Sequence, residues 1–363
     1  SNEAKALGIP MGAPAFQFEA LFKKNQVQVY SSNYALYGDM SSRVMNLLTT
    51  FTPEIEVYSI DEAFLKFKGF ELFDLEEYGI KMQRTVTKGT GIPVSIGFAP
   101  TKALAKVANK IAKKFPERTQ SVYVIDSEEK RIKALKWTKI ADVWGIGRRY
   151  AKRLESLHIK TAYAFTQLSD DWVRKEMSVV GLRLKRELEG KPTLDLEEAS
   201  NKKAIATTRS FEKTYSTLDQ VSERVATFTA HCAEKIRKQQ SQCNLVMVFV
   251  KTNGFSADAP QYSRSIVIKT DYPTDSTIDL NRYAQIGLKA IFKEGYQYKK
   301  AGVICMGLTP NATVQLSLFN TANPKHQPLM RVVDRLNHSI GKTVVRFATQ
   351  SIGRQWKMKQ EKL

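Results

Sequence analysis

The sequence is poor in the residues that build metal sites and disulfide frameworks, and it lacks any long apolar run. Its three cysteines, Cys232, Cys243 and Cys305, are widely spaced without a CxxC pair, and its four histidines form no cluster with ligand spacing. This pattern argues against zinc or disulfides and favours reduced core thiols in a cytoplasmic protein. No stretch approaches the roughly 18–20 consecutive apolar residues that cross a bilayer, so we expect no membrane partner.

Acidic residues are also in the minority. The chain of 363 residues contains 56 lysines and arginines against 36 aspartates and glutamates, a formal net charge of +20. Hydrophobic residues make up 42% of it, which is a globular composition and excludes intrinsic disorder. The excess of positive charge favours a polyanionic partner, and nucleic acid fits better than an anionic membrane because no apolar span is present.

The hydrophobic pattern changes along the chain from mixed strands and helices to helices alone and back again. Strands and helices alternate up to residue 126, and the pattern is then helical until a polar linker at 197–204. Beyond the linker we predict strand, helix, strand, strand, helix and strand over 205–213, 217–240, 244–252, 263–270, 278–293 and 298–308. This organisation predicts an α+β multidomain protein with a β-α-β-β-α-β domain in its second half.

A strand predicted over 55–67 contains two adjacent acids, Asp61 and Glu62, within the run YSIDEAFLKF. Ionised carboxylates are rarely buried without a partner, and neighbouring side chains in a regular strand point to opposite faces. The pair can share a ligand only at a hairpin end or bulge; the alternative is that both acids face solvent at a strand end. Such carboxylates suit Mg²⁺ bound together with substrate phosphates, although a two-metal site needs at least one further carboxylate.

A lysine-rich helix is predicted over 101–115, with Thr101 as a natural N-cap. Helical spacing places five lysines on the side opposite Leu104, Val107 and Ile111. These lysines are Lys102, Lys106, Lys110, Lys113 and Lys114. The pattern fits a ridge that faces phosphates, with one lysine reaching a nucleoside triphosphate, and it equally fits a solvated helix face.

A glycine turn between two predicted helices indicates a DNA contact. Gly145, Ile146 and Gly147 resemble the turn of a helix-hairpin-helix motif, and Arg148 follows just inside the next helix. Backbone N–H groups at that helix start can approach a DNA phosphate closely, which contacts the backbone without reading sequence. The alternative interpretation is an ordinary turn between two helices.

A short apolar peptide, QLSLF, follows the last predicted domain. Its residues are Gln315, Leu316, Ser317, Leu318 and Phe319. They match at every position the peptide with which bacterial DNA-processing enzymes bind the sliding clamp, where apolar anchors fill a pocket. The alternative interpretation is a tail that docks on the protein itself.

These segments together resemble the Y-family translesion DNA polymerases, in particular their UmuC-like branch. The likeness covers essentially the whole chain and includes EVYSIDEAF, VSIGFAPTKALAKVANKIAKK, DVWGIGRR and QLSLF. It implies a right-hand polymerase with palm, fingers, thumb and little finger. The implied domains are partial fingers at 1–34, a palm at 35–128 lacking its N-terminal strand, a helical thumb at 129–198, a little finger at 205–310, and the clamp-binding peptide with a basic tail at 311–363.

The resemblance also implies roles for individual residues. Asp61 would bridge metals and Glu62 would complete an Mg²⁺ site for the attacking 3′-hydroxyl, while Lys5 and Lys113 would bind the triphosphate. The implied activity is error-prone translesion synthesis in the SOS response. The implied partners are damaged primer-template DNA, deoxynucleoside triphosphates, the bacterial sliding clamp, UmuD′-like accessory subunits and a RecA filament.

One departure from the family pattern concerns its first motif, an aspartate followed closely by an aromatic cluster. The chain does not contain it, so we expect the chain to be N-terminally truncated and inactive by itself, while the full-length protein is a polymerase. The alternative is a non-catalytic DNA- and clamp-binding protein whose palm has decayed or been truncated.

Overall fold

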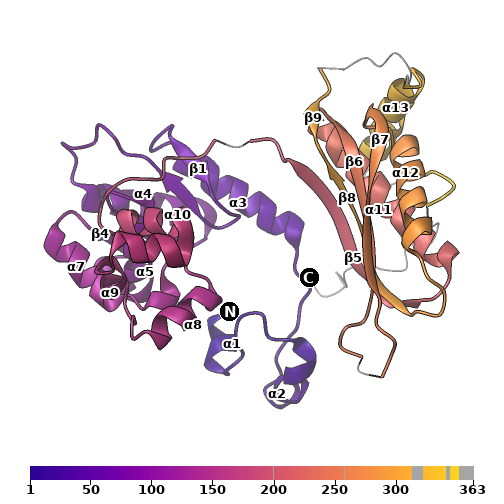
Figure 1. The fold of residues 1–363 in the computed structure, drawn as a ribbon. Helices are drawn as coiled ribbons and strands as arrows, with labels where there is room; N and C mark the ends of the chain where they lie inside the picture. Colours follow the sequence, from indigo (N-terminus) through magenta and orange to yellow (C-terminus); the bar gives the residue numbers. More distant parts are fainter. Residues whose placement is uncertain (199, 257, 313–321, 341–343, 351–363) are drawn as a thin grey trace. The chain divides into compact units, whose positions relative to one another are not determined.

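The computed structural model describes the chain except for residues 199, 257, 313–321, 341–343 and 351–363. It divides into two compact units, one formed by residues 32–199 and the other by residues 1–31 and 200–363 (Figure 1). None of the helices in the described part of the chain combines the length and apolarity that crossing a bilayer requires. Each unit is described by itself.

The unit of residues 32–199 combines two small sheets with many helices. Its first half contains α3 (Tyr34–Leu48), β1 (Ile55–Val57), β2 (Ala63–Leu65), α4 (Leu75–Thr90), β3 (Ile96–Phe98), α5 (Lys102–Lys114), α6 (Pro116–Thr119) and β4 (Val122–Val124). Its second half contains α7 (Glu128–Trp137), η2 (Ile140–Asp142), α8 (Arg148–Ser156), α9 (Ala162–Thr166) and α10 (Asp170–Leu188). Strands β1 and β2 pair antiparallel, and β3 and β4 pair parallel.

The prediction of one continuous strand over 55–67 is wrong. The structure has two strands of three residues each, paired from Ile55 opposite Leu65 to Val57 opposite Ala63. The chain reverses between them, so the apolar residues on both sides of the reversal belong to different strands. Strand alternation in the sequence cannot distinguish a hairpin from a single strand when the turn contains no glycine or proline.

Helix α5 forms where its lysine and apolar residues predict it. The Thr101 side chain accepts a hydrogen bond from the N–H of Leu104, which confirms Thr101 as the N-cap. Leu104, Val107 and Ile111 are buried. Gly97 in β3 lies so close under this helix that a Cβ atom there would come within 2.1 Å of the backbone nitrogen of Asn109. Strand β3 and helix α5 therefore pack backbone to backbone.

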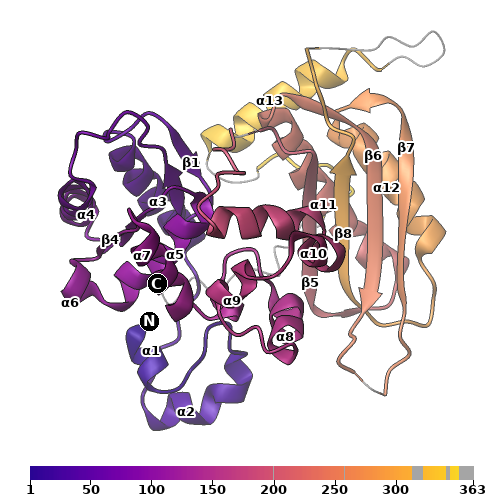
Figure 2. The ribbon, with the colours of Figure 1, turned by 60° about the vertical axis from the view of Figure 1, so that its left-hand side comes forward.

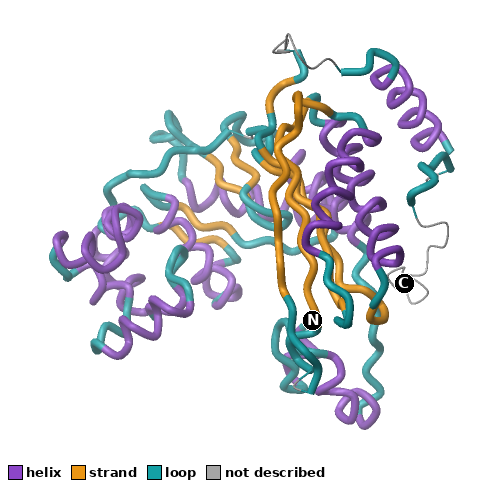
Figure 3. Tube along the Cα trace, turned by 45° about the vertical axis from the view of Figure 1, so that its right-hand side comes forward, coloured by secondary structure: helices purple, strands orange, loops and turns teal. Residues whose placement is uncertain are grey.

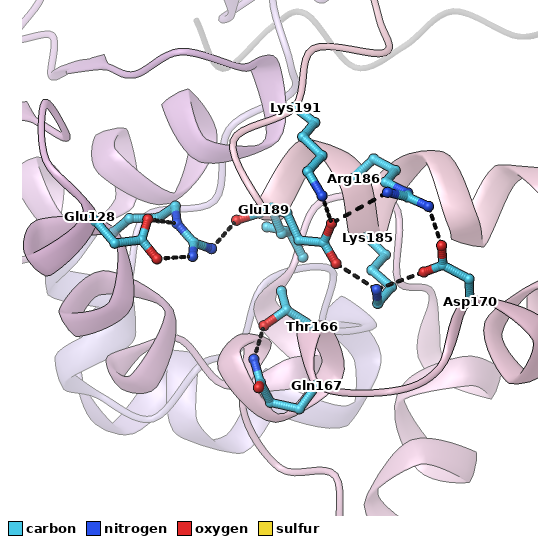
Figure 4. Close-up of polar contacts among 10 residues, drawn as sticks. Glu128, Thr166, Gln167, Asp170, Lys185, Arg186, Glu189 and Lys191 are labelled. Carbon is cyan, nitrogen blue, oxygen red and sulfur yellow. Dashed lines mark hydrogen bonds and ion pairs between the residues drawn. The ribbon is translucent and has the colours of Figure 1, made fainter.

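In the helical half of this unit a network of charges joins the first residue of α10, Asp170, to residues at its end (Figure 4). Lys185 is largely buried and lies between Asp170, at 2.7 Å, and Glu189. The hydrogen bond from Lys185 lowers the pKa of the Asp170 carboxyl. Burial alone would raise the pKa of Glu189, but bonds from Lys185 and Lys191 lower it overall. Figure 2 shows α10 beside α9.

The second unit contains three short helices and a sheet domain. Residues 1–31 form α1 (Asn2–Ala6), η1 (Ala15–Phe18) and α2 (Glu19–Lys24). The sheet domain contains β5 (Ala204–Tyr215), α11 (Leu218–Lys238), β6 (Ser241–Thr252), β7 (Ser263–Thr274), α12 (Thr277–Ile291), β8 (Tyr298–Met306) and β9 (Thr309–Pro310). This order confirms the predicted β-α-β-β-α-β domain.

The strands of the sheet domain lie in the order β5-β8-β6-β7, with β9 paired to β6, and all described pairs are antiparallel. Helices α11 and α12 cover one face of this sheet, as the purple helices beside the orange strands show in Figure 3. Along β6, Val246, Val248 and Val250 point to the helices and are buried. The alternating residues Phe249 and Lys251 point to the other face, which we call the open face.

A further helix, α13 (His326–Ser339), lies in the segment that the sequence predicted to be a basic tail. Met330 and Val333 are buried, and Arg237 of α11 forms an ion pair with Asp334 at 2.6 Å. The basic tail therefore contains a helix that the sequence pattern did not predict. The exposed Arg331 lies on a different side of the helix from its buried residues.

Candidate functional site

Asp61 and Glu62 lie at the tip of the hairpin between β1 and β2, in residues 58–62, which we call the acid turn. The backbone N–H groups of Tyr58 and Ser59 both donate to the carbonyl oxygen of Glu62, at 3.0 and 3.1 Å. The turn is therefore closed by its own backbone, and both acidic side chains are exposed. The pair lies at a hairpin end and both acids face solvent, so the position fits both interpretations, and a shared ligand stays a prediction. A turn also removes the need to bury either charge.

The two carboxylates have different partners within the protein. The Ser59 hydroxyl donates to Asp61 Oδ1 at 2.6 Å, whereas Glu62 forms an ion pair with Lys106 of α5. The Lys106 ammonium also lies 5.9 Å from the centroid of the Tyr58 ring, within the range of a cation–π contact. Lys106 therefore contacts both ends of the acid turn and supplies the positive charge nearest Glu62.

The acid turn fits one part of a magnesium site. Asp61 and Glu62 are adjacent, exposed and offer carboxylate oxygens, the ligands that Mg²⁺ prefers. In the described residues no group of three or more His, Cys, Asp or Glu side chains is arranged to hold a metal ion. These two residues would therefore hold Mg²⁺ only together with oxygens from other groups, such as substrate phosphates.

The lysines of α5 are not one continuous ridge open to phosphates. Lys102 is 10% exposed and forms an ion pair with Glu56 of β1, so the prediction that it faces phosphates is wrong. Lys110 lies 2.6 Å from Asp142 of η2. Carboxylates that approach from β1, the acid turn and η2 thus neutralise one side of the helix, which helical spacing alone could not reveal.

Lys113 and Lys114 lie exposed in the last turn of α5. Lys113 as a triphosphate ligand stays a prediction, and so does Lys5, which lies exposed in α1 in the other unit. The predicted clamp-binding residues 315–319 lie outside the described residues.

Residues 145–147, which we call the glycine loop, connect η2 to α8. Gly145 has a φ of +90°, a conformation that other residues rarely adopt, and Ile146 between the glycines is buried. Gly147 is the N-cap of α8 and is exposed, as is Arg148 in the first helical turn. The buried Ile146 holds the loop while the flanking backbone faces outward, which is the shape that the predicted DNA contact needs.

The sequence did not predict the contact between the acid turn and Trp144, the residue directly before the glycine loop. The indole N–H of Trp144 donates to the hydroxyl of Tyr58 at 3.0 Å. The ring centroids lie 5.7 Å apart, and Phe64 completes the aromatic cluster. The two residues are 86 positions apart, and no local pattern links them.

The open face of the sheet domain has basic residues at positions that the strand register brings together. Lys251 of β6 lies opposite Lys300 of β8, and Lys269 of β7 lies opposite Leu245. Gly302 of β8 lies under the ring of Phe249, because a Cβ atom there would come within 2.4 Å of it. The open face, with these lysines, is therefore a candidate surface for binding a polyanion.

Comparison with known proteins identifies the family. Residues 1–110 match the impB/mucB/samB family, and residues 202–318 match the C-terminal domain of the impB/mucB/samB family. Protein UmuC of Salmonella typhimurium is 39% identical to this chain over 100% of the chain and 87% of UmuC. The chain belongs to the impB/mucB/samB family. Protein ImpB of Salmonella typhimurium is 38% identical, again over 100% of this chain and 87% of the relative.

The fold of this impB/mucB/samB family member is that of the Y-family DNA polymerases. A solved structure of a Y-family DNA polymerase chimera of Dbh and Dpo4 matches with a TM-score of 0.68 and 21% identity, covering 86% of this chain and 87% of the chimera. The palm, fingers, thumb and little-finger architecture thus fits the two units. Residues 327–363, which include most of α13, match a domain of unknown function.

Proposed function

We propose that the protein performs error-prone translesion DNA synthesis in the SOS response, by Mg²⁺-dependent nucleotidyl transfer to a primer 3′ end. The class of enzyme, a DNA-directed DNA polymerase, follows from the family and the fold. The observation that supports the site is the acid turn, in which Asp61 and Glu62 are exposed side by side at a hairpin tip. Bound Mg²⁺ would neutralise the phosphates and favour attack by the 3′-hydroxyl.

The residues of this chain supply positioning and charge at the site. Asp61 and Glu62 would orient the cations, and the hydrogen bond from Ser59 restricts the rotation of the Asp61 carboxylate. Lys106 keeps the Glu62 side chain directed towards α5. Lys5 and Lys113 would neutralise the triphosphate, a role in which a flexible ammonium suits a moving leaving group.

Two surfaces would bind the primer-template. The exposed N–H groups at the start of α8 can receive a phosphate, because they have no partner within their own helix turn. The lysines of the open face, Lys251, Lys269 and Lys300, would neutralise phosphates of the duplex. Neither surface contacts base edges by itself, so the proposed grip is independent of sequence and tolerates damaged templates.

The remaining partners are proposed from the sequence. Residues 315–319 would bind the bacterial sliding clamp through apolar anchors, and this would hold the enzyme at the primer end. UmuD′-like accessory subunits and a RecA filament would recruit it at damaged sites in the cytoplasm. Peptide competition with the sequence QLSLF in a clamp-binding assay tests the first of these, and unchanged clamp binding would contradict it.

Primer extension on intact and abasic templates tests the function, measured with the natural protein at full length. We expect Asp61→Asn and Glu62→Gln to lower the rate of nucleotide addition about 100-fold or more, with duplex affinity measured without metal unchanged within about twofold. Glu117→Gln, a change in the exposed first turn of α6, is the matched control and should leave the rate unchanged. Equal rates in all three variants would contradict the proposed role of the acid turn.

A second candidate function is a non-catalytic DNA- and clamp-binding protein. The ion pair between Glu62 and Lys106 favours it, because it already neutralises one of the two carboxylates without any metal. In that case the natural protein would bind duplex DNA and the clamp but add no nucleotide with Mg²⁺ or Mn²⁺. If the natural protein extends a primer and the Asp61→Asn variant does not, this candidate is excluded.

A further inference from the structure

Trp144 occupies the position where the glycine loop meets the acid turn. Its indole N–H donates to the hydroxyl of Tyr58 at 3.0 Å, with the two ring planes at 81°. The indole ring also lies 5.7 Å from the ring of Phe64 in β2. A tryptophan N–H that is partly enclosed needs an acceptor, so this bond determines the orientation of the two rings as well as their distance.

Tyr58 connects this bond to the carboxylates. Its backbone N–H donates to the carbonyl oxygen of Glu62 at 3.0 Å, which closes the acid turn. Its ring lies against the ammonium of Lys106, which forms the ion pair with Glu62. A displacement of Tyr58 therefore changes the backbone position of Glu62 and the position of its counter-charge together.

Trp144 is joined just as closely to the glycine loop. Val143, directly before it, and Ile146, two residues after it, are buried, and the N–H of Ile146 donates to the carbonyl of Val143 at 3.0 Å. Gly145, which follows Trp144 directly, has a φ of +90° and lies against Leu184 of α10. The backbone around Trp144 is thus a tight turn, so movement of the loop also moves the indole.

We infer that Trp144 is a positioning residue. Its hydrogen bond to Tyr58 links the binding of a DNA strand at the glycine loop to the placement of Asp61 and Glu62 for a divalent cation. The inference rests on the proposed function for the identity of these two ligands. Coupling of this kind is reciprocal: if duplex DNA raises the affinity for the cation by some factor, the cation raises the affinity for DNA by the same factor.

Two conservative variants remove the hydrogen bond and keep the aromatic packing, namely Trp144→Phe and Tyr58→Phe. Mn²⁺ is the probe, with the free ion measured by electron paramagnetic resonance, and the affinity for a primer-template duplex is measured by fluorescence anisotropy. Each titration is done with and without the other ligand, on the natural protein at full length. The ratio of the two Mn²⁺ affinities gives the coupling factor.

In the unaltered protein we expect the duplex to raise Mn²⁺ affinity. We expect each variant to lower the coupling factor about three- to tenfold, which corresponds to the net loss of one hydrogen bond. Duplex affinity without metal should change by less than about twofold. The double variant should lose no more coupling than either single variant, because one bond accounts for both effects.

Trp137→Phe is the matched control, since the ring of Trp137 packs on Phe115 instead, with centroids 5.6 Å apart. This variant should keep the full coupling factor. A merely structural role for Trp144 predicts a lower unfolding temperature and an unchanged coupling factor, and that result would overturn the inference. An equal loss of coupling in Trp137→Phe would overturn it as well.

The same measurements separate this inference from the proposed function. If the natural protein adds no nucleotide but shows a coupling that Trp144→Phe weakens, the polymerase function fails and the inference stands. If primers are extended and Trp144→Phe leaves the coupling factor intact, the function stands and the inference is overturned.

Discussion

Lys102 and Glu56 form an ion pair in which each side chain is only 10% exposed. The Glu56 carboxylate also accepts the backbone N–H of Glu197 at 2.8 Å, and the Lys102 ammonium lies 5.0 Å from the centroid of the Phe64 ring. This pair therefore joins β1, α5 and the segment that follows α10. It holds in place the strands from which the acid turn extends.

Removal of one partner of this pair should destabilise the unit of residues 32–199 strongly. Lys102→Met leaves Glu56 buried without its counter-charge, which costs about 3–5 kcal/mol of unfolding free energy. Lys102→Met combined with Glu56→Gln should cost clearly less. Urea unfolding followed by tryptophan fluorescence measures this. Asp39→Asn, which breaks the exposed pair with Arg43, is the control and should cost less than about 1 kcal/mol.

Gly97→Ala should destabilise the same unit by about 1–3 kcal/mol or more, because the added methyl group would overlap the backbone of α5. Gly38→Ala is the matched control. Gly38 lies inside α3 with no atom within 4 Å of a Cβ, so alanine should stabilise that helix by about 0.5–1 kcal/mol. Urea midpoints of the two variants should therefore shift in opposite directions, and equal shifts would contradict the close packing of β3 on α5.

Asp170 should make the stability depend on pH in acid. Lys185 and Arg186 lower the pKa of Asp170 below its ordinary value of 3.8. A carboxyl with a lowered pKa stabilises the folded state above its ordinary pKa, and this stabilisation is lost as pH falls through the folded-state pKa. Asp170→Asn should thus lower the unfolding free energy at pH 6. The difference in unfolding free energy between the variant and the unaltered protein should shrink towards pH 3 and below. Urea titrations across this range measure it, and a constant difference would contradict the pairing.

Binding of duplex DNA should depend steeply on salt, and the open face should contribute to that dependence. Lys251→Ala and Lys269→Ala should each reduce the slope of log affinity against log salt by about one unit, as expected for one phosphate contact per lysine. Lys289→Ala is the control, because Lys289 lies on α12, on the helical side of the sheet. Fluorescence anisotropy at several salt concentrations measures the slopes; an equal change in all three variants would exclude the open face as the contact.

The sequence was most informative where the signal is local. The sheet domain follows the predicted order because apolar alternation marks each strand and helical spacing marks α11 and α12 within a few residues. Thr101 could be recognised as an N-cap because capping depends on the next three residues. The pair Asp61 and Glu62 stood out because two charges in an apolar run contradict simple burial.

Two other features could not be predicted from the sequence, because they depend on packing between elements. The acid turn, where the chain reverses, contains neither glycine nor proline, so the sequence predicted a continuous strand there. Helix α13 was not predicted because its buried stripe, Met330 and Val333, is narrow. In both cases the deciding contribution comes from packing against another element, which a local pattern does not contain.

By itself the sequence determined the order of the elements in the sheet domain, the family likeness and the acids most suited to a cation. Only the tertiary structure decided what surrounds those acids. Lys106 meets Glu62 across 44 residues, Lys102 meets Glu56 across 46, and Trp144 meets Tyr58 across 86. Such contacts depend on how strands and helices pack in three dimensions, and residue type and spacing along the chain do not specify that packing.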